Sequence, residues 1–212
     1  MVTFTIVRHG ETLLNLLGRA QGWSDSPLTP GGIEVAAELG ARLQGVTFDA
    51  AYASDTLRAV RTGEEILWAS GNEKIPLRRD RRLREWCLGS MEAEDNARFQ
   101  ETVSRWLGGV TSFRELNRRL PDVAEAIYRH DTTGMAEPFP AIIRRLKDMI
   151  EETARSFPPE NRTNVLVVTH AFLIKTVLYL YAPEQLEAIA KLKNASGFRL
   201  TYKNGGFTLE QL

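Results

Sequence analysis

Two histidines and an arginine stand directly after apolar runs, where side chains often do chemistry. Arg8 and His9 follow the apolar residues 4–7, and His170 follows residues 165–168 after one threonine. Short apolar runs of this kind are typical of buried strands, and open α/β folds bind their ligands at the carboxyl ends of such strands. Two histidines with an adjacent arginine therefore predict an anion site at the edge of a sheet.

The rest of the chain supplies the elements that such a sheet needs. Thr29 and Pro30 suit the N-cap and first turn of a helix, and Ser54 or Asp55 suits the N-cap of the next helix. Apolar residues at helical spacing predict further helices from about residue 138 and through residues 173–178. Short strands are expected at residues 48–53, at an edge position at 75–77, and at 165–168, with a terminal hairpin at 198–202 and 207–209.

Alternating strands and helices indicate an α/β fold, here a three-layer α/β/α sandwich with a mostly parallel central sheet. We expect a single domain over residues 1–212. Residues 90–136 are polar and irregular, with a glycine pair at 108–109, and predict short helices inserted over the core as a lid. If the strands before Arg8, Ser54 and His170 are parallel, their ends meet at one pocket.

The composition indicates which cellular compartment and which kinds of binding partner to expect. Lysine plus arginine and aspartate plus glutamate number 27 each, so no net field attracts nucleic acid or an anionic membrane. Cys87 is the single cysteine, which excludes an intrachain disulfide and fits a reducing compartment. The first residues do not predict a signal peptide, and no stretch of about 20 apolar residues predicts a membrane-spanning helix. We therefore expect a cytoplasmic protein with a small-molecule partner, and neither a nucleic acid nor a membrane as partner.

Four ordered stretches carry a family resemblance. They are residues 8–12 with Asn15 and 21–29, then 54–59 with Thr62, then 83–85 with Gly89, and finally 169–170. In composition and order they resemble the motifs of the histidine phosphatase superfamily, the phosphoglycerate mutase-like group with an Arg-His-Gly motif. The resemblance covers nearly the whole chain and implies an enzyme that transfers phosphoryl groups.

The resemblance assigns a role to each of five catalytic residues. His9 would attack phosphorus as a neutral imidazole and form a phosphohistidine. Arg8 and Arg58 would bind the phosphoryl oxygens, and His170, held as an imidazolium by the phosphate, would donate a further hydrogen bond. Glu85 would protonate the leaving alcohol and then activate water. Further phosphate or substrate contacts fall on Asn15, Gln21, Gly22 and Ala171.

Some of these residues also have a purely structural interpretation. Arg58 could lie on a solvated helix face, and Glu85, within the charge-rich stretch 80–92, could form a structural salt bridge. Asn15 and Gln21 could make hydrogen bonds within their loop. His130, in the lid and outside every motif, is expected on the surface.

The residues that follow Glu85, the expected general acid, differ from those of the mutases in this superfamily. These mutases carry Glu-Arg-x-Tyr-Gly, in which the arginine and tyrosine bind the phosphoglycerate carboxylate. Trp86 and Leu88 replace these two residues here, which disfavours mutase activity. After His170, Ala171 and Phe172 stand where many relatives have Gly-Gly or Gly-Asn, so Phe172 either narrows the pocket or turns its ring elsewhere.

Two other phosphatase chemistries fit the sequence poorly. A cysteine phosphatase needs an arginine six positions after its cysteine, and Ala93 stands there after Cys87. A metallohydrolase needs grouped ligands, and the histidines at 9, 130 and 170 show no metal-ligand spacing.

The sequence therefore predicts a metal-independent phosphomonoesterase that acts on a small phosphorylated metabolite through a phosphohistidine and uses no cofactor. The alternatives are a cofactor-dependent phosphoglycerate mutase and a catalytically weak phospho-ligand-binding protein. A nucleophile paired with an acid argues against simple binding. The terminal hairpin leaves a homodimer open, and aromatic residues at 23, 86, 99 and 106 could form an apolar wall that sets specificity.

Overall fold

The computed structural model describes residues 1–109, 112–158, 160–189 and 192–212, and its strands form one mixed sheet. The strands are β1 (Val2–Arg8), β2 (Ala50–Ala53), β3 (Leu77–Arg79), β4 (Thr163–Thr169), β5 (Gly197–Lys203) and β6 (Gly206–Gln211). Their order across the sheet is β3-β2-β4-β1-β5-β6. The first four are mutually parallel, whereas β5 is antiparallel to β1 and forms a hairpin with β6. The mostly parallel sheet and the terminal hairpin are confirmed.

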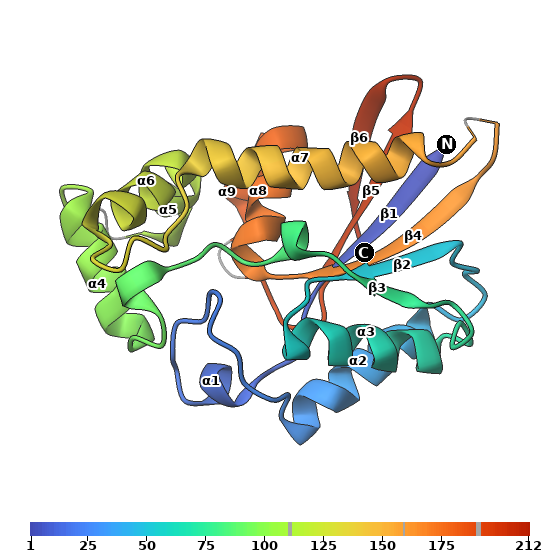
Figure 1. The fold of residues 1–212 in the computed structure, drawn as a ribbon, viewed down its shortest axis with the longest axis horizontal. Coiled ribbons are helices and arrows are strands. Elements are labelled where there is room, and N and C mark those ends of the chain that lie inside the picture. The colour runs from blue at the N-terminus through green and yellow to red at the C-terminus, as the bar shows by residue number, and fades with distance from the viewer. Residues whose placement is uncertain (110–111, 159, 190–191) are drawn as a thin grey trace.

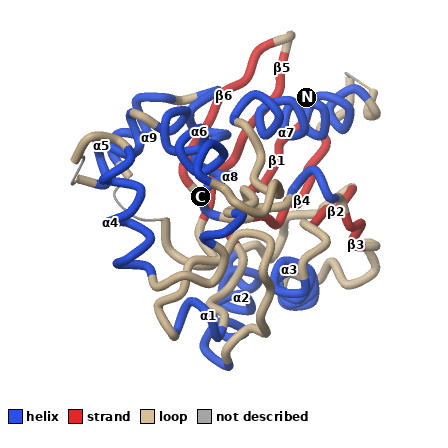
Figure 2. The backbone as a smooth tube through the Cα atoms, turned by 60° about the vertical axis from the view of Figure 1, so that its left-hand side comes forward, coloured by secondary structure: helices blue, strands red, loops and turns tan. Residues whose placement is uncertain are grey.

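Helices cover both faces of this sheet, which confirms the three-layer sandwich. Helices α2 (Pro30–Arg42) and α3 (Leu57–Ala69) lie on one face, and α7 (Phe139–Arg155) and α8 (Ala171–Tyr181) lie on the other (Figures 1 and 2). The remaining helices are α1 (Leu13–Leu16), α4 (Asn96–Trp106), α5 (Phe113–Arg118), α6 (Leu120–His130), α9 (Pro183–Ala188) and the 3-10 turns η1 (Arg81–Leu83) and η2 (Gly89–Met91).

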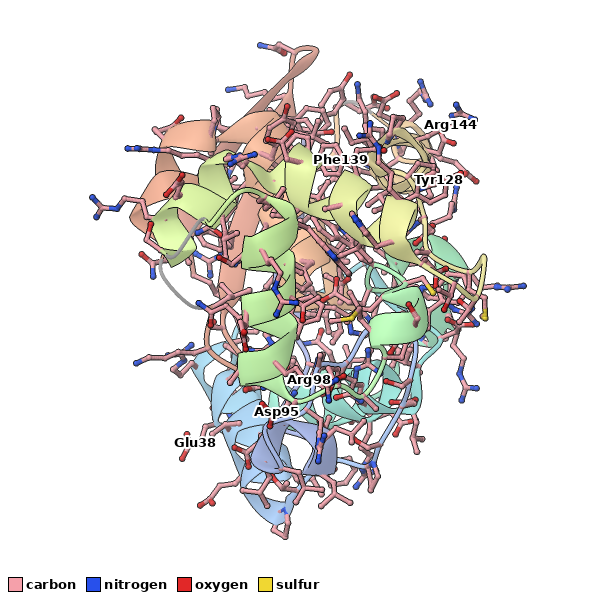
Figure 3. All side chains as sticks on the ribbon, turned by 90° about the vertical axis from the view of Figure 1, so that its left-hand side faces the viewer. Glu38, Asp95, Arg98, Tyr128, Phe139 and Arg144 are labelled. Atoms are coloured by element: carbon pink, nitrogen blue, oxygen red, sulfur yellow. The ribbon has the colours of Figure 1, made fainter. Side chains whose placement is uncertain are left out.

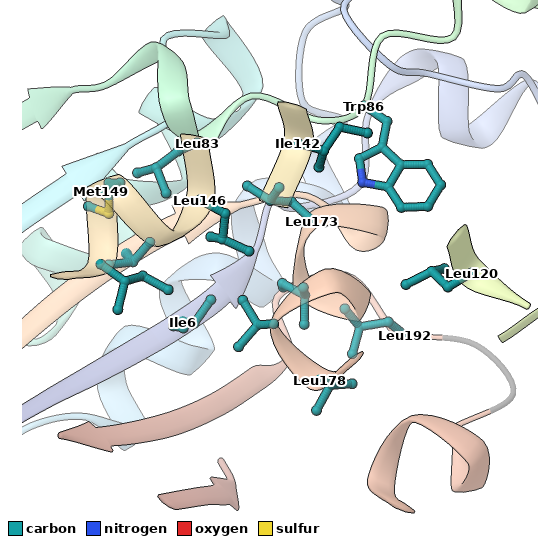
Figure 4. Packing of buried hydrophobic residues seen from close by; sticks show 14 of the residues in the cluster. Ile6, Leu83, Trp86, Leu120, Ile142, Leu146, Met149, Leu173, Leu178 and Leu192 are labelled. Atoms are coloured by element: carbon teal, nitrogen blue, oxygen red, sulfur yellow. The ribbon is translucent and has the colours of Figure 1, made fainter. Parts of the chain in front are cut away.

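The two cores follow from the alternation of side chains along each strand. Ile6 of β1 packs in the core shared with α7 and α8, beside Leu146 and Leu173 (Figure 4). Its neighbour Val7 points to the opposite face and packs in the core shared with α2 and α3, which includes Ile66. Because both faces are covered, the central strands place apolar side chains on both of their faces.

The start of α2 agrees with the sequence, but the start of α3 does not. The Thr29 side chain accepts a hydrogen bond from the Gly32 N–H, as an N-cap should. Thr56 occupies the N-cap position of α3 without a side-chain capping bond to the helix, so the expected cap at Ser54 or Asp55 was wrong. Asp55 is instead held by Arg84, and the Leu57 N–H donates to Asp25 from a distant loop.

Residues 90–136 contain the helices α4, α5 and α6, as expected for a lid. Asp95 caps α4 through the N–H groups of Ala97 and Arg98, and Figure 3 shows this helix in front of the sheet. Val103 of α4 and Leu120 of α6 belong to the same apolar core as α8. The lid helices are therefore packed on the α8 side of the sheet, beside the ends of β1 and β4.

Helix α7 shows the predicted buried stripe, which consists of Ile142, Leu146, Met149, Ile150 and Thr153. The edge strand β3 lies two residues later than expected. Helix α9 was not predicted from the sequence.

Candidate functional site

The carboxyl ends of three parallel strands bring the motif residues together. Arg8 at the end of β1 lies opposite Thr169 at the end of β4, and Ala53 of β2 lies opposite Val168. The His9 N–H donates to the Thr169 carbonyl at 2.9 Å, which continues the β1–β4 ladder by one residue. The predicted meeting of these strand ends is confirmed.

His9 is buried, with 3% of its surface exposed, and its ring is oriented by its own turn. Nδ1 lies 2.7 Å from the Gly10 carbonyl oxygen, so Nδ1–H donates and Nε2 keeps its lone pair. Burial, reinforced by the charges of Arg58 and Arg8, lowers the pKa of His9 well below its ordinary value. The ring is therefore neutral at pH 7, which is the form that can act as a nucleophile.

Gly10 allows the turn that carries His9 to lie against helix α2. A Cβ atom at position 10 would lie 2.4 Å from the Gly32 carbonyl oxygen, which no side chain can tolerate. The Gly10 N–H also donates to the Thr62 hydroxyl at 2.9 Å. The turn is thus fixed against α2 and α3 together.

Arg58 is fully buried in the first turn of α3, so the solvated-face interpretation is wrong. Its Nη1 donates to the Ser24 carbonyl and to Asp25, at 2.7 and 3.0 Å. Its Nη2 donates to the Gly22 carbonyl at 2.6 Å and to Nδ1 of His170 at 3.1 Å. The guanidinium therefore ties the loop around residue 24 to the end of β4.

His170 is also fully buried, and its ring centre lies 5.2 Å from that of His9. Burial and the neighbouring Arg58 charge lower its pKa well below the usual value. The imidazolium expected from the sequence is thus disfavoured by these surroundings, and only a nearby anion would offset them. Because Nδ1 accepts from Arg58, the proton of the neutral ring is on Nε2, which can still donate to a ligand.

Glu85 is buried, with 3% exposed, and binds the start of helix α8. Its Oε2 accepts from the Phe172 N–H at 2.9 Å, and its Oε1 accepts from Leu173 and Trp86 at 2.9 and 3.0 Å. Burial raises its pKa, although these N–H groups and Arg58 oppose the shift. Glu85 makes no ion pair with the described residues, so the salt-bridge interpretation is wrong.

Arg145 of α7 holds the segment that carries Glu85, a role that the sequence analysis missed. Its guanidinium donates to the carbonyls of Arg82, Arg84 and Glu85 at 2.7, 2.6 and 3.0 Å. Glu137 neutralises its charge at 2.9 Å. The sequence did contain a signal for this role, because Arg145 follows Ile142 by three residues and so lies on the apolar stripe of α7.

Three buried donor groups around His9 have no hydrogen-bond partner within the described part of the chain. They are Nε of Arg8, Nε of Arg58 and Nε2 of His170. Buried polar groups are nearly always paired, and an unpaired donor costs free energy. Three such donors at adjoining strand ends are what an anion-binding site requires.

A cavity of about 350 Å³ opens onto this site. Arg8, His9 and Glu85 line its base, whereas Arg58 and His170 are buried beside it. The polar residues Arg19, Asn96, Gln100, Asn117 and Lys175 also line the cavity. The apolar part of its wall consists of Leu88, Phe99, Val103, Leu116, Leu120, Val123, Phe172 and Leu192. The lid helices α4, α5 and α6 therefore supply most of the wall.

The predicted aromatic wall is only partly correct. Phe99 lines the cavity, but Trp86 lies behind it and stacks on Phe172, with ring centres 4.8 Å apart. Trp106 stacks on His130 at 4.2 Å, and this exposed histidine lies outside the cavity, as expected.

The secondary contact residues fall into two groups. Asn15, Gln21 and Ala171 line the cavity. Nδ2 of Asn194, a residue not predicted from the sequence, donates to Oδ1 of Asn15 at 3.3 Å and to the His9 carbonyl at 3.1 Å. Gly22 is outside the cavity lining, and its N–H donates to Glu92 at 3.1 Å.

Within the described ranges, no three His, Cys, Asp or Glu residues are grouped closely enough to hold a metal ion. None of the helices that could be described combines the length and the apolar character needed to cross a membrane.

Comparison with known proteins gives a consistent picture. The model of the histidine phosphatase superfamily (branch 1) matches residues 4–212. The 2,3-bisphosphoglycerate-dependent phosphoglycerate mutase 2 of Gloeobacter violaceus is 31% identical over 197 residues, which are 89% of this chain and 81% of that protein. The crystal structure of phosphoglycerate mutase from Bacillus anthracis is similar over 100% of this chain and 92% of that chain, at 35% identity and a TM-score of 0.91. Phosphoserine phosphatase from Entamoeba histolytica shares the fold over 100% of this chain and 96% of that chain, at 23% identity and a TM-score of 0.72.

Proposed function

Because the chain belongs to branch 1 of the histidine phosphatase superfamily, we propose that it hydrolyses phosphomonoesters of small metabolites through a phosphohistidine on His9. The observation that carries the proposal is the set of unpaired buried donors on Arg8, Arg58 and His170 around a neutral histidine. These donors match the charge that spreads over the phosphoryl oxygens during transfer.

In the first step, Nε2 of His9 forms a bond to phosphorus while the bond from phosphorus to the ester oxygen breaks. Burial raises the pKa of Glu85 and so favours its protonated form, whose proton goes to the departing alcohol oxygen. Oε2 is suited to hold the proton because it accepts one hydrogen bond, whereas Oε1 accepts two.

In the second step, the Glu85 carboxylate takes a proton from water as the water oxygen attacks phosphorus. The bond from His9 to phosphorus breaks, inorganic phosphate leaves, and Glu85 is again protonated. Both steps use donors of the protein for charge stabilisation, so a metal ion has no required role.

Phosphoglycerate mutase is the second candidate, since relatives at 31% and 35% identity carry that name. The surroundings of Glu85 support hydrolysis instead. Trp86 is 1% exposed and directs Nε1 to the Thr176 hydroxyl at 3.1 Å, while Leu88 presents an apolar wall. Neither side chain can bind a phosphoglycerate carboxylate.

The test measures both reactions on one preparation. Phosphate release from a panel of phosphomonoesters is compared with the interconversion of 2- and 3-phosphoglycerate. We expect release to exceed interconversion, and His9→Ala to abolish it while His130→Ala retains it. Faster interconversion than release would establish the mutase instead.

A further inference from the structure

Lys175 is a cation on the wall of the catalytic cavity to which the proposed mechanism gives no role. It lies on α8 four residues after Ala171, and both residues line the cavity. Residues four apart lie on the same face of a helix, about 6 Å apart along its axis. Lys175 is therefore one helical turn farther along the cavity wall than the residue next to His170.

No carboxylate neutralises Lys175 among the residues that the structure describes. Its ammonium lies 5.5 Å from the centre of the Phe172 ring, and it makes neither a hydrogen bond nor an ion pair with any described residue. Arg58 and Arg145, by contrast, have the acidic partners Asp25 and Glu137.

The surroundings make this unpaired charge unfavourable. Lys175 faces a cavity whose wall includes leucine, valine and phenylalanine side chains. Burial lowers its pKa to about 8, partly opposed by Glu85 and assisted by Arg8. Glu85 is the one carboxylate among the lining residues described, and backbone N–H groups already bind it. An anion that entered the cavity would form a strong pair with Lys175 in this low-dielectric space.

We propose that Lys175 binds a second anionic group of the substrate, on the alcohol side of the phosphoester, and so determines specificity. The preferred substrates then carry a phosphoryl group at His9, an apolar body against the lid residues, and a carboxylate or second phosphate about one helical turn away. This proposal rests on the proposed function, because it takes the phosphoryl group to lie at His9.

Binding of phosphonates tests the proposal without requiring turnover. Phenylphosphonate, 4-carboxyphenylphosphonate and 1,4-phenylenediphosphonate are titrated by calorimetry into the wild type, Lys175→Met, Lys175→Arg and the control Lys147→Met on the exposed face of α7. We expect the wild type to favour at least one doubly anionic probe over phenylphosphonate by about 10- to 100-fold, the usual value of a charged hydrogen bond. Lys175→Met should lose this preference, whereas Lys175→Arg and Lys147→Met should keep it.

The two doubly anionic probes distinguish a carboxylate from a phosphate as the second group. Equal affinity of the wild type for all three probes, or a preference that survives in Lys175→Met, would overturn the assignment. Hydrolysis of phenyl phosphate is measured in parallel. If the wild type does not hydrolyse phenyl phosphate, the proposed function is refuted. The preference among the phosphonates tests the role of Lys175 independently of that result.

Discussion

Nη2 of Arg58 lies 3.1 Å from Nδ1 of His170. A guanidinium can only donate, so this contact assigns the proton of the neutral His170 ring to Nε2. The same positive charge opposes protonation of the ring. One arginine therefore determines both the tautomer and the charge of the histidine at the end of β4.

We expect His9 and His170 to stay neutral as the pH is lowered from 7 to 5.5, because burial and the arginine charges lower both pKa values. The measurement is NMR of the imidazole rings, assigned with the variants His9→Gln and His170→Gln. The unfolded chain binds protons at these residues below about pH 6.5 and the native protein does not, so both residues make the protein less stable as the pH falls. Ring titrations near pH 6.5 for these two residues would contradict the expectation.

A phosphohistidine should form on His9. Brief reaction with a reactive phosphomonoester, followed by acid or alkaline quench, should reveal a phosphoryl group that is labile in acid and stable in base, since protonated imidazole is a good leaving group. His9→Ala should lose both the adduct and turnover, while His170→Ala should leave a slow adduct. Mass spectrometry identifies the phosphorylated residue. An adduct on another residue would show that His9 is not the nucleophile.

Glu85→Gln should slow the hydrolysis of alkyl phosphates far more than the hydrolysis of p-nitrophenyl phosphate. A general acid contributes about 10²- to 10⁴-fold when the leaving group needs a proton, and p-nitrophenolate hardly needs one. Steady-state kcat on the two substrates gives the comparison. Equal losses on both substrates would mean that the carboxylate only positions the start of α8, which it contacts through Phe172 and Leu173.

Phosphate release should continue in excess EDTA. Arg8, Arg58 and His170 supply the positive charge and hydrogen-bond donors that a metal ion would otherwise provide. The rate is measured before and after chelation, with Mg²⁺ or Zn²⁺ added back. Inactivation that either ion reverses would show that the mechanism is incomplete.

Lys175→Met should stabilise the protein at pH 7. The native pKa of about 8 lies below the ordinary 10.5, so between these values the unfolded chain binds a proton that the native protein lacks. The lysine thus destabilises the protein most below pH 8 and progressively less up to about pH 10.5. The gain in unfolding free energy of the variant, from urea titrations, should shrink over this range, and a constant gain would contradict the assignment.

The strand ends could be predicted because local patterns encode them. Residues 4–7 and 165–168 are short apolar runs, and Thr29 before Pro30 marks a helix start by its own chemistry. Contacts between distant segments carry no such local signal. Asp25 receives the first N–H of α3, and Asn194 holds the loop of His9, and both depend on how the chain folds back on itself.

Lys175 illustrates a second limit of the sequence. It falls within an apolar helix pattern, where a lysine usually extends to solvent along its aliphatic stem. Only the position of the lid shows that its face of α8 borders a cavity. Gly22 gives the opposite case, because it stands within a motif and yet its N–H is occupied by Glu92.

The cavity has a base and a wall of different origin, since strand ends supply Arg8 and His9, whereas α4, α5 and α6 supply most of the apolar wall. Under the proposed function, the lid sets the shape of the apolar wall, whereas the strand ends and Lys175 of α8 bind the charged groups of the substrate. Mutations in the lid would then change which apolar substrate bodies fit the cavity without altering Arg8, His9 or Lys175. The same division gives protein engineers a defined region, residues 96–130, in which to vary side chains while the chemistry is inherited intact.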